Sequence, residues 1–288
     1  MMKIIDFHTH TFPDAIAAAA IEKLQAASHT RPFTDGTVSG LQKSMAEAGI
    51  TASVVLPVAT SPRQVVHVND ASIRMNDEAG KTGVYSFGGM HPDFSEYKAE
   101  LRRIAAAGLR GIKLHPVYQG VDFDDPRFLR ILETAASLGL LVLIHAGLDV
   151  GFPGAEHAIP RKIKNALRSV GPVRLILAHM GGWRCWDEVG ETLADTSVLI
   201  DTSFSLGAMT PGSDGYYKTP RELALLDEER FVSLIRAFGS RRVLFGTDCP
   251  WGEQKTEIQK FLALPLTAEE RGDILWGNGS RLLILNPN

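Results

Sequence analysis

The feature that most constrains the fold is a regular alternation of short apolar runs with longer stretches of helical character. The stretches, such as residues 96–108, 125–139 and 230–239, have helical spacing and are rich in Ala, Leu, Glu, Lys and Arg. Strands that alternate with helices predict a parallel sheet covered on both faces. The eight apolar runs are KIIDF from Lys3, ASVVLPVA from Ala52, GVYSFGG from Gly83, GIKLH from Gly111, LVLIH from Leu141, VRLILAH from Val173, VLIDTS from Val198 and RVLFGTD from Arg242.

Eight strand-and-helix units in one chain match a (β/α)8 barrel, which typically needs about 250 residues. The alternative is a doubly wound open sheet, but no G-x-G-x-x-G pattern follows the first run, where the dinucleotide fingerprint of that fold would lie. No linker or change of composition marks a boundary. We therefore expect residues 1–288 to form a single α/β domain, a (β/α)8 TIM barrel with a C-terminal helical extension.

Two segments interrupt the alternation. Residues 28–37 and 205–220 are rich in Gly, Pro, Ser and Thr, which is typical of loops. The second segment follows the seventh run, on the barrel face where substrates bind. It is either a lid or pocket wall or a solvated loop without a function.

Composition narrows the class of protein. The chain is 44% hydrophobic and has a formal net charge of −3, and its charges are spread along the sequence, so there is no basic stripe for a nucleic acid. Only two cysteines occur, which fits a reducing compartment. Neither an export signal nor a run of about 18 apolar residues is present. We expect a cytoplasmic protein that binds neither nucleic acid nor membrane, and whether it forms a homo-oligomer stays open.

Polar residues follow the apolar runs, at the ends that a barrel brings to one mouth. His8 and His10 are two residues apart, so in a strand they share a face and lie about 6.6 Å apart along it. Alone, they also fit a strand end that meets water or caps the next helix. Six of the nine histidines belong to this set, however, and chance placement explains that poorly. The set comprises Asp6, His8, His10, His91, Lys113, His115, His145, His179, Asp201 and Asp248.

Histidine and carboxylate side chains of this set suit a catalytic metal. Zn²⁺ in a catalytic site takes about three or four protein ligands and keeps an open position for water. His8, His10, His145 and Asp248 can supply these ligands. A bound ion lowers the pKa of its water to about 7, and a nearby carboxylate, for which Asp248 is the candidate, then takes the proton. We expect one divalent metal, zinc first and manganese as the alternative.

Five motifs carry a resemblance to a known family. DFHTH, GIKLHP, LIHAG, LAHMGG and GTDCPW, in this order, resemble the amidohydrolase superfamily of metal-dependent (β/α)8 hydrolases. The similarity is to the amidohydrolase-related branch, which also contains aminocarboxymuconate-semialdehyde decarboxylase. It runs from about residue 3 to residue 251 and extends to NGSRLL near the C-terminus.

The resemblance implies roles for individual residues. His8, His10 and His145 would bind the metal, and Asp248 would both contact the metal and shuttle protons. His179 would polarise a substrate carbonyl or act as a second acid or base.

Arg184, in GGWRCW, is a further candidate. Its planar guanidinium suits a substrate carboxylate, and the alternative is a solvated arginine at the rim.

Two related groups fit less well. GMHP around His91 also resembles the metal-dependent deoxyribonucleases of the superfamily, which usually carry a metal-binding glutamate on the fourth strand, where this chain has Lys113. The polymerase-and-histidinol-phosphatase group would be expected to end in a D-x-H pattern, whereas this chain has TDCPW. Both departures count against those activities.

Lys113 has three interpretations. Carboxylated, it would bridge two metals; as a cation, it would bind an anionic group of the substrate; or it would pair with an acidic neighbour such as Asp6. We favour one metal, because the branch with IKLHP is mostly mononuclear. His115 is a ligand, a residue that orients one, or a substrate contact, and Trp251 is expected in the apolar pocket wall.

The leading functional hypothesis is a hydrolase that attacks an amide, ester or lactone carbonyl of a small molecule with metal-activated water. The alternative is a non-oxidative decarboxylase with the same ligands. The chain is somewhat short for such decarboxylases, which favours hydrolysis. A third hypothesis is a barrel that binds a metal or small molecule without turnover, and the complete ligand set argues against it.

Overall fold

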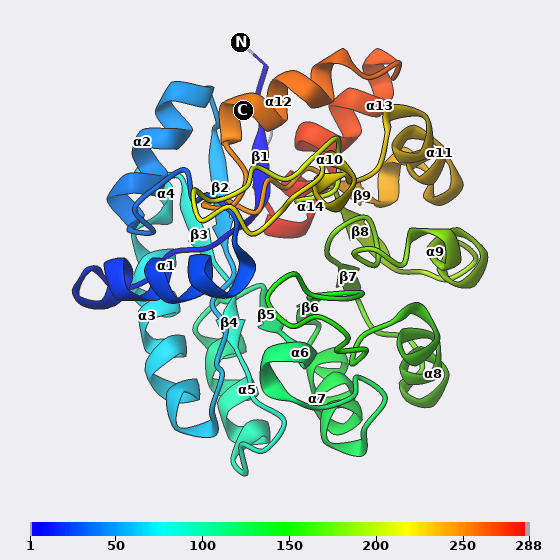
Figure 1. Ribbon diagram of the computed structural model, residues 1–288. Coiled ribbons are helices and arrows are strands. Elements are labelled where there is room, and N and C mark those ends of the chain that lie inside the picture. Colours follow the sequence, from blue (N-terminus) through cyan, green and yellow to red (C-terminus); the bar gives the residue numbers. More distant parts are fainter. Residues whose placement is uncertain (1, 286–288) are drawn as a thin grey trace.

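The structure, a computed structural model that describes residues 2–285, is a ring of short parallel strands surrounded by helices (Figure 1). Regular pairing divides the strands into a three-stranded sheet, β1-β2-β3, and a six-stranded sheet, β4-β5-β6-β7-β8-β9. The strands are β1 Ile5–Thr9, β2 Ala52–Val55, β3 Val84–Ser86, β4 Gly88–Gly89, β5 Gly111–Leu114, β6 Leu141–Ile144, β7 Leu175–Leu177, β8 Leu199–Asp201 and β9 Val243–Leu244.

Backbone hydrogen bonds bring the two ends of this strand order together. The amide of Phe7 donates to the carbonyl of Phe245 over 2.8 Å, and the amide of His10 donates to the carbonyl of Cys249 over 2.7 Å. At the other junction, β3 and β4 are separated by Phe87 alone. The regular ladders do not form one closed barrel, but the chain follows the course of one.

Helices occupy the connections between strands and lie around the ring. The longer ones are α1 Asp14–Ser28, α2 Val38–Ala48, α3 Val65–Asp77, α5 Tyr97–Ala106, α7 Pro126–Ser137, α8 Pro160–Val170, α9 Trp186–Leu193, α11 Glu228–Phe238 and α12 Gln254–Ala263. The shorter ones are α4 Ala79–Thr82, α6 Pro116–Gln119, α10 Pro220–Leu223, α13 Ala268–Gly272 and α14 Asn278–Leu283, with 3-10 turns at η1 Pro62–Gln64 and η2 Ser240–Arg242 and a π-helical turn at η3 Asp273–Gly277.

The strands are mostly apolar because both of their faces are buried, and their polar residues, such as Asp6, Lys113 and Asp201, are buried as well. On one face, residues such as Ile112 and Val142 join a large core with helix residues such as Ile131. On the other face, residues such as Phe7 and Leu143 form a smaller core inside the ring, which Leu283 of α14 joins.

The (β/α)8 class predicted from the sequence is confirmed. Each of the eight apolar runs contains a strand, and the third run is interrupted at Phe87. Helices occupy the three stretches predicted to be helical. In the described part of the chain, no helix is both long and apolar enough to cross a membrane.

The two predicted loops contact each other. The amide of Arg31 donates to the carbonyl of Thr210 over 2.9 Å, and the amide of Gly212 donates to the carbonyl of His29 over 2.7 Å. His29 also bonds the carboxylate of Asp214 over 2.6 Å. The segment after β8 is therefore attached to the C-terminal end of α1.

Gly147 and Gly139 offer a matched test of backbone packing. Both have a positive φ, +89° and +69°. A Cβ atom at position 147 would lie 2.2 Å from the amide nitrogen of Trp183, whereas one at position 139 would meet nothing within 4 Å. Gly139→Ala should lower the free energy of unfolding by about 1 kcal/mol through left-handed strain alone. Gly147→Ala should lower it by more than about 3 kcal/mol, because backbone must move.

Urea unfolding of the two variants measures this difference. Equal midpoints for Gly147→Ala and Gly139→Ala would contradict the close approach of the backbone at Gly147 to the backbone at Trp183.

Candidate metal centre and active-site pocket

A cavity of about 600 Å³ lies at the carboxyl ends of the strands. This volume is typical of a small-molecule site, for which about 300–1,000 Å³ is usual. Polar side chains from the ends of five strands reach it. The predicted site residues that line it are His8, His10, Lys113, His115, His145, His179, Asp248 and Trp251.

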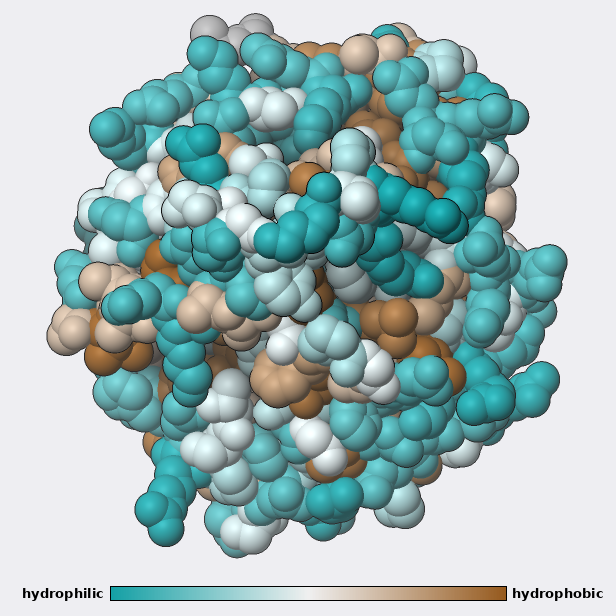
Figure 2. Space-filling view, in the orientation of Figure 1, coloured by the Kyte–Doolittle hydropathy of each residue, from teal (hydrophilic) through white to brown (hydrophobic). Residues whose placement is uncertain are grey.

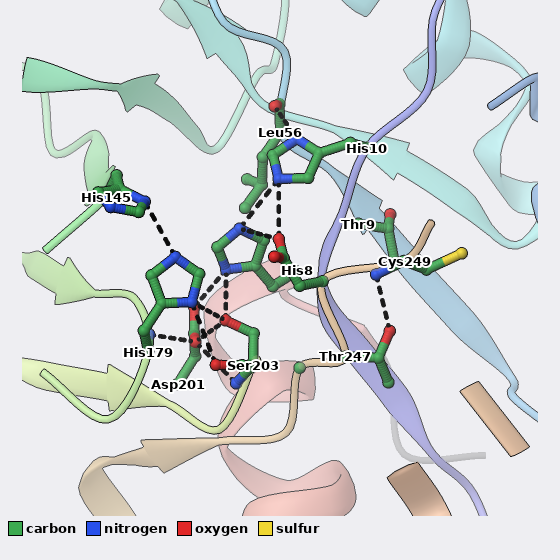
Figure 3. A network of polar contacts seen from close by, with 12 residues as sticks. His8, Thr9, His10, Leu56, His145, His179, Asp201, Ser203, Thr247 and Cys249 are labelled. Atoms are coloured by element: carbon green, nitrogen blue, oxygen red, sulfur yellow. Dashed lines mark hydrogen bonds and ion pairs between the residues drawn. The ribbon is translucent and has the colours of Figure 1, made fainter. Parts of the chain in front are cut away.

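Three of these residues converge on one point. Nε2 of His8 lies 3.2 Å from Nε2 of His10 (Figure 3). Oδ1 of Asp248 lies 3.3 Å from the first nitrogen and 3.1 Å from the second. The first and last strands of the chain thus bring together three of the four predicted metal ligands.

The opposite nitrogens of the two rings are held by acceptors. Nδ1 of His10 donates to the carbonyl oxygen of Leu56 over 2.9 Å, and Nδ1 of His8 lies 2.7 Å from Oδ2 of Asp201. An acceptor at Nδ1 places the proton there and leaves a lone pair on Nε2. Burial, and then the positive charge of Lys113, hold the pKa of His8 well below its usual value, so this ring is neutral.

Two unprotonated nitrogens cannot satisfy each other. The Nε2 lone pairs of His8 and His10 and an oxygen of Asp248 point into one small volume, and a cation is the partner that suits all three. Metal-bound histidines usually donate their other N–H to a carboxylate or a backbone carbonyl, as these two do. The donor set therefore fits a divalent metal.

Asp248 is ionised in this surrounding. Burial raises the pKa of its carboxyl group, but the close contact with His10 and the neighbouring His8 and His179 outweigh burial and lower this pKa below the usual range. Asp248 and His179 also have positive φ angles, 64° and 60°. Strained backbone of this kind is commonly found at functional sites.

His145 lies elsewhere in the cavity. Its Nδ1 is 3.0 Å from Nε2 of His179, and its Nε2 donates to the carbonyl of Leu148 over 2.8 Å. Neither nitrogen joins His8, His10 and Asp248. The metal-ligand role of His145 stays a prediction, and the contact that the structure shows is with His179.

A second group of possible ligands consists of His115, His145 and Asp149. Nδ1 of His115 accepts from the amide of Tyr118, so the proton of a neutral ring is on Nε2, which lies 3.7 Å from Asp149. Nε2 of His145, also protonated, lies 3.4 Å from the same carboxylate. Both nitrogens that face the Asp149 carboxylate thus carry protons and offer no lone pair, so this group fits a metal poorly.

Lys113 is buried, and its Nζ lies 3.4 Å from Nε2 of His8. Burial lowers the pKa of Lys113 to about 8, although Asp201, Asp248 and Asp149 oppose the shift. Asp6 accepts hydrogen bonds from Thr247 over 2.6 Å and Gln254 over 2.7 Å. The structure therefore does not support the pairing of Lys113 with Asp6.

Arg184 does not reach the cavity. Its side chain is exposed, donates to the carbonyl of Glu222 over 2.7 Å and lies over the ring of Trp183. Arg184 has a positive φ, 60°, and lies in the loop between β7 and α9. Asp6, inside β1, and His91, which follows β4, are also absent from the cavity lining.

Sequence reasoning missed three residues that shape the site. The sequence indicates only that Asp201 lies at a strand end. In the structure, Oδ1 of Asp201 accepts from the amide of His179 over 3.0 Å, and its Oδ2 lies 2.7 Å from Nδ1 of His8. Ser203 lies 3.0 Å from Nδ1 of both rings. Asp149 follows His145 by four residues, a spacing that carries no recognisable signal in a loop. Asp201 and Ser203 fix two rings from different strands, which only the fold brings together.

The chain matches the family model described as "Amidohydrolase" over residues 5–285, and it belongs to this family. The family is metal-dependent and includes both hydrolases and decarboxylases. No curated protein matches the sequence.

Solved structures share the fold. An uncharacterised TIM-barrel protein from Bordetella bronchiseptica is 19% identical, with 98% of this chain and 99% of that chain covered and a TM-score of 0.74. 5-Carboxyvanillate decarboxylase from Sphingomonas paucimobilis is 16% identical, with 99% and 100% covered and a TM-score of 0.69. A candidate 2-pyrone-4,6-dicarboxylic acid hydrolase from Pseudomonas putida is 18% identical, with 100% of both chains covered and a TM-score of 0.65.

The metal centre predicts the metal content of purified protein. Wild-type protein should hold about one equivalent of a divalent metal, and the double variant His8→Ala, His10→Ala should lose it because two of three converging ligands are gone. His67→Ala is the matched control, since His67 lines the cavity but not the cluster. Plasma mass spectrometry gives the content. Full occupancy in the double variant would rule out this centre.

Proposed function

We propose that the protein is a metal-dependent hydrolase that cleaves an amide, ester or lactone of a small molecule. The observation that carries the proposal is the convergence of two Nε2 lone pairs and the Asp248 carboxylate inside a cavity of small-molecule size. His8, His10 and Asp248 would hold the metal, for which zinc is the first choice and manganese the alternative. When bound, such an ion supplies a Lewis acid that polarises a carbonyl and acidifies water.

Asp248 is the proposed proton carrier. Its carboxylate is ionised and lines the cavity, so it accepts the proton of the attacking water and passes it to the leaving group. The backbone hydrogen bond from its own amide to the carbonyl of His8, 2.9 Å long, fixes the carboxylate against the metal ligands.

His179 and His145 form the proposed second acid. Nδ1 of His179 donates to the carbonyl of Ser203 over 3.1 Å, which orients the ring and directs Nε2 toward His145. Since Nε2 of His145 donates to the carbonyl of Leu148, the two facing nitrogens both carry lone pairs when the rings are neutral, and the pair acts as an acid once it has taken up one proton between them, beside the cavity that both rings line. This proton stabilises negative charge that develops on the substrate oxygen.

A non-oxidative decarboxylase is the second candidate. The observation that favours it is Lys113, a buried amine beside His8 that suits a substrate carboxylate. Both reactions would use the same residues. Turnover in ¹⁸O-labelled water separates them, because hydrolysis puts one labelled oxygen into the acid product, whereas decarboxylation releases carbon dioxide and puts none there.

Asp248→Asn tests the assignment of the proton carrier. With any substrate that wild type cleaves, this variant should lose at least about 100-fold in kcat/KM, since positioned proton transfer contributes about 10²–10⁴-fold. Asp77→Asn, at an exposed position on α3, should keep wild-type activity.

Metal content is measured on the same samples of Asp248→Asn. Wild-type kcat/KM in a variant that still holds its metal would remove Asp248 from the mechanism.

A further inference from the structure

The cavity extends well beyond the polar cluster. One face of α1 lines it, through residues spaced three or four apart as a single helical stripe requires. These residues are Ile16, Ala19, Ala20, Lys23, Leu24 and Ser28. Apart from Lys23 and Ser28, the stripe is apolar, so most of the α1 wall of the cavity is hydrocarbon.

α1 has a second apolar face that packs against the protein. Ala17 and Ile21 are buried, and the side chain of Ile21 lies against Gly36. A surface helix normally has polar residues opposite its buried face. Here Ala15, Ile16, Ala18 and Ala19 are exposed instead, and Figure 2 shows pale brown to brown surface at the left of the molecule, where α1 lies.

Further walls of the cavity are largely apolar. Thr60, Gln64 and His67 belong to them, but the segment after β2 contributes Leu56, Pro57 and Val58, and α3 contributes Val68. Side chains of these kinds, left without a protein partner in a cavity, favour an apolar ligand because contact removes both surfaces from water.

The side-chain charges of the cavity lining support a ligand with little net charge, because the proposed divalent metal is already matched by the carboxylates of Asp149 and Asp248. The other cations are Lys23, which is exposed, and Lys113, which faces the site carboxylates. The lining includes no arginine among residues 2–285, and Asp149 and Asp248 are both part of it. Several substrate carboxylates would meet too few cations and two anions.

We infer that the substrate carries a large neutral apolar group that lies against the α1 stripe while its carbonyl lies beside His8, His10 and Asp248. The identity of the reacting end rests on the proposed function; the apolar chamber, defined as the space between the α1 stripe and Leu56, Pro57, Val58 and Val68, does not. The substrate class is therefore an amide, ester or lactone with an extended alkyl or aryl substituent.

Methyl ketones test the chamber without any reaction, because they have a carbonyl but neither hydrolyse nor decarboxylate. Titration calorimetry on the metal-loaded protein gives dissociation constants for 2-butanone, 2-hexanone and 2-octanone. A buried methylene contributes roughly a factor of four to affinity. 2-Octanone has four more methylenes than 2-butanone, so we expect it to bind about 250-fold more tightly if all four are buried and at least about 10-fold more tightly if half of them are.

Ala19→Glu should abolish most of this length dependence, leaving less than about threefold, because it puts a carboxylate into the apolar wall. Ala18→Glu is the matched control: Ala18 is exposed on the same helix and does not line the cavity. Glutamate is a good helix former, so both variants should fold.

The outcomes separate the chamber from the chemistry. Equal affinity for all three ketones in wild type, or an equal length dependence in Ala19→Glu and Ala18→Glu, would overturn the apolar chamber. If the length dependence is present in wild type and lost only in Ala19→Glu, the apolar chamber is supported. This holds even if no ester, amide or lactone is cleaved; that separate result would refute the proposed function.

Discussion

The hydrogen bonds between the first and last strands are the constraint on which the site depends. The amide of Asp248 donates to the carbonyl of His8, and the amide of His10 donates to the carbonyl of Cys249. These bonds join positions about 240 residues apart in sequence and hold the two histidines and the carboxylate in register. A barrel that failed to close here would still have its core, but its three converging donor atoms would separate.

The site concentrates polar groups where the surrounding protein is apolar, and it does so by giving nearly every group a fixed partner. Asp201 is central, because one of its oxygens holds His8 and the other accepts from the amide of His179. Buried polar groups are costly unless they are hydrogen-bonded. The acceptors at Nδ1 of His8 and His10 also select the tautomer of each ring, so the unprotonated Nε2 atoms are those that face the cavity.

The cavity has a polar end and an apolar end, which suit different parts of a ligand. At one end, histidines and carboxylates act on a carbonyl group, and at the other, α1 and the segment after β2 supply hydrocarbon. α1 is also attached at its C-terminal end to the loop after β8, through the backbone of His29 and Arg31. The loop predicted as a lid or wall thus contacts the end of the helix that lines the chamber, and none of residues 205–220 lines the cavity itself.

The barrel could be predicted from the sequence alone, because the eight apolar runs at regular intervals leave few other ways to bury both faces of each strand. The sequence also determined most of the polar site, since residues at the carboxyl ends of barrel strands must meet at one mouth. Only the tertiary structure decided the pairing of His145 with His179, the exclusion of Arg184, and the roles of Asp149, Asp201 and Ser203. Those outcomes depend on strand-end backbone angles and on contacts between loops far apart in sequence, which local patterns do not encode.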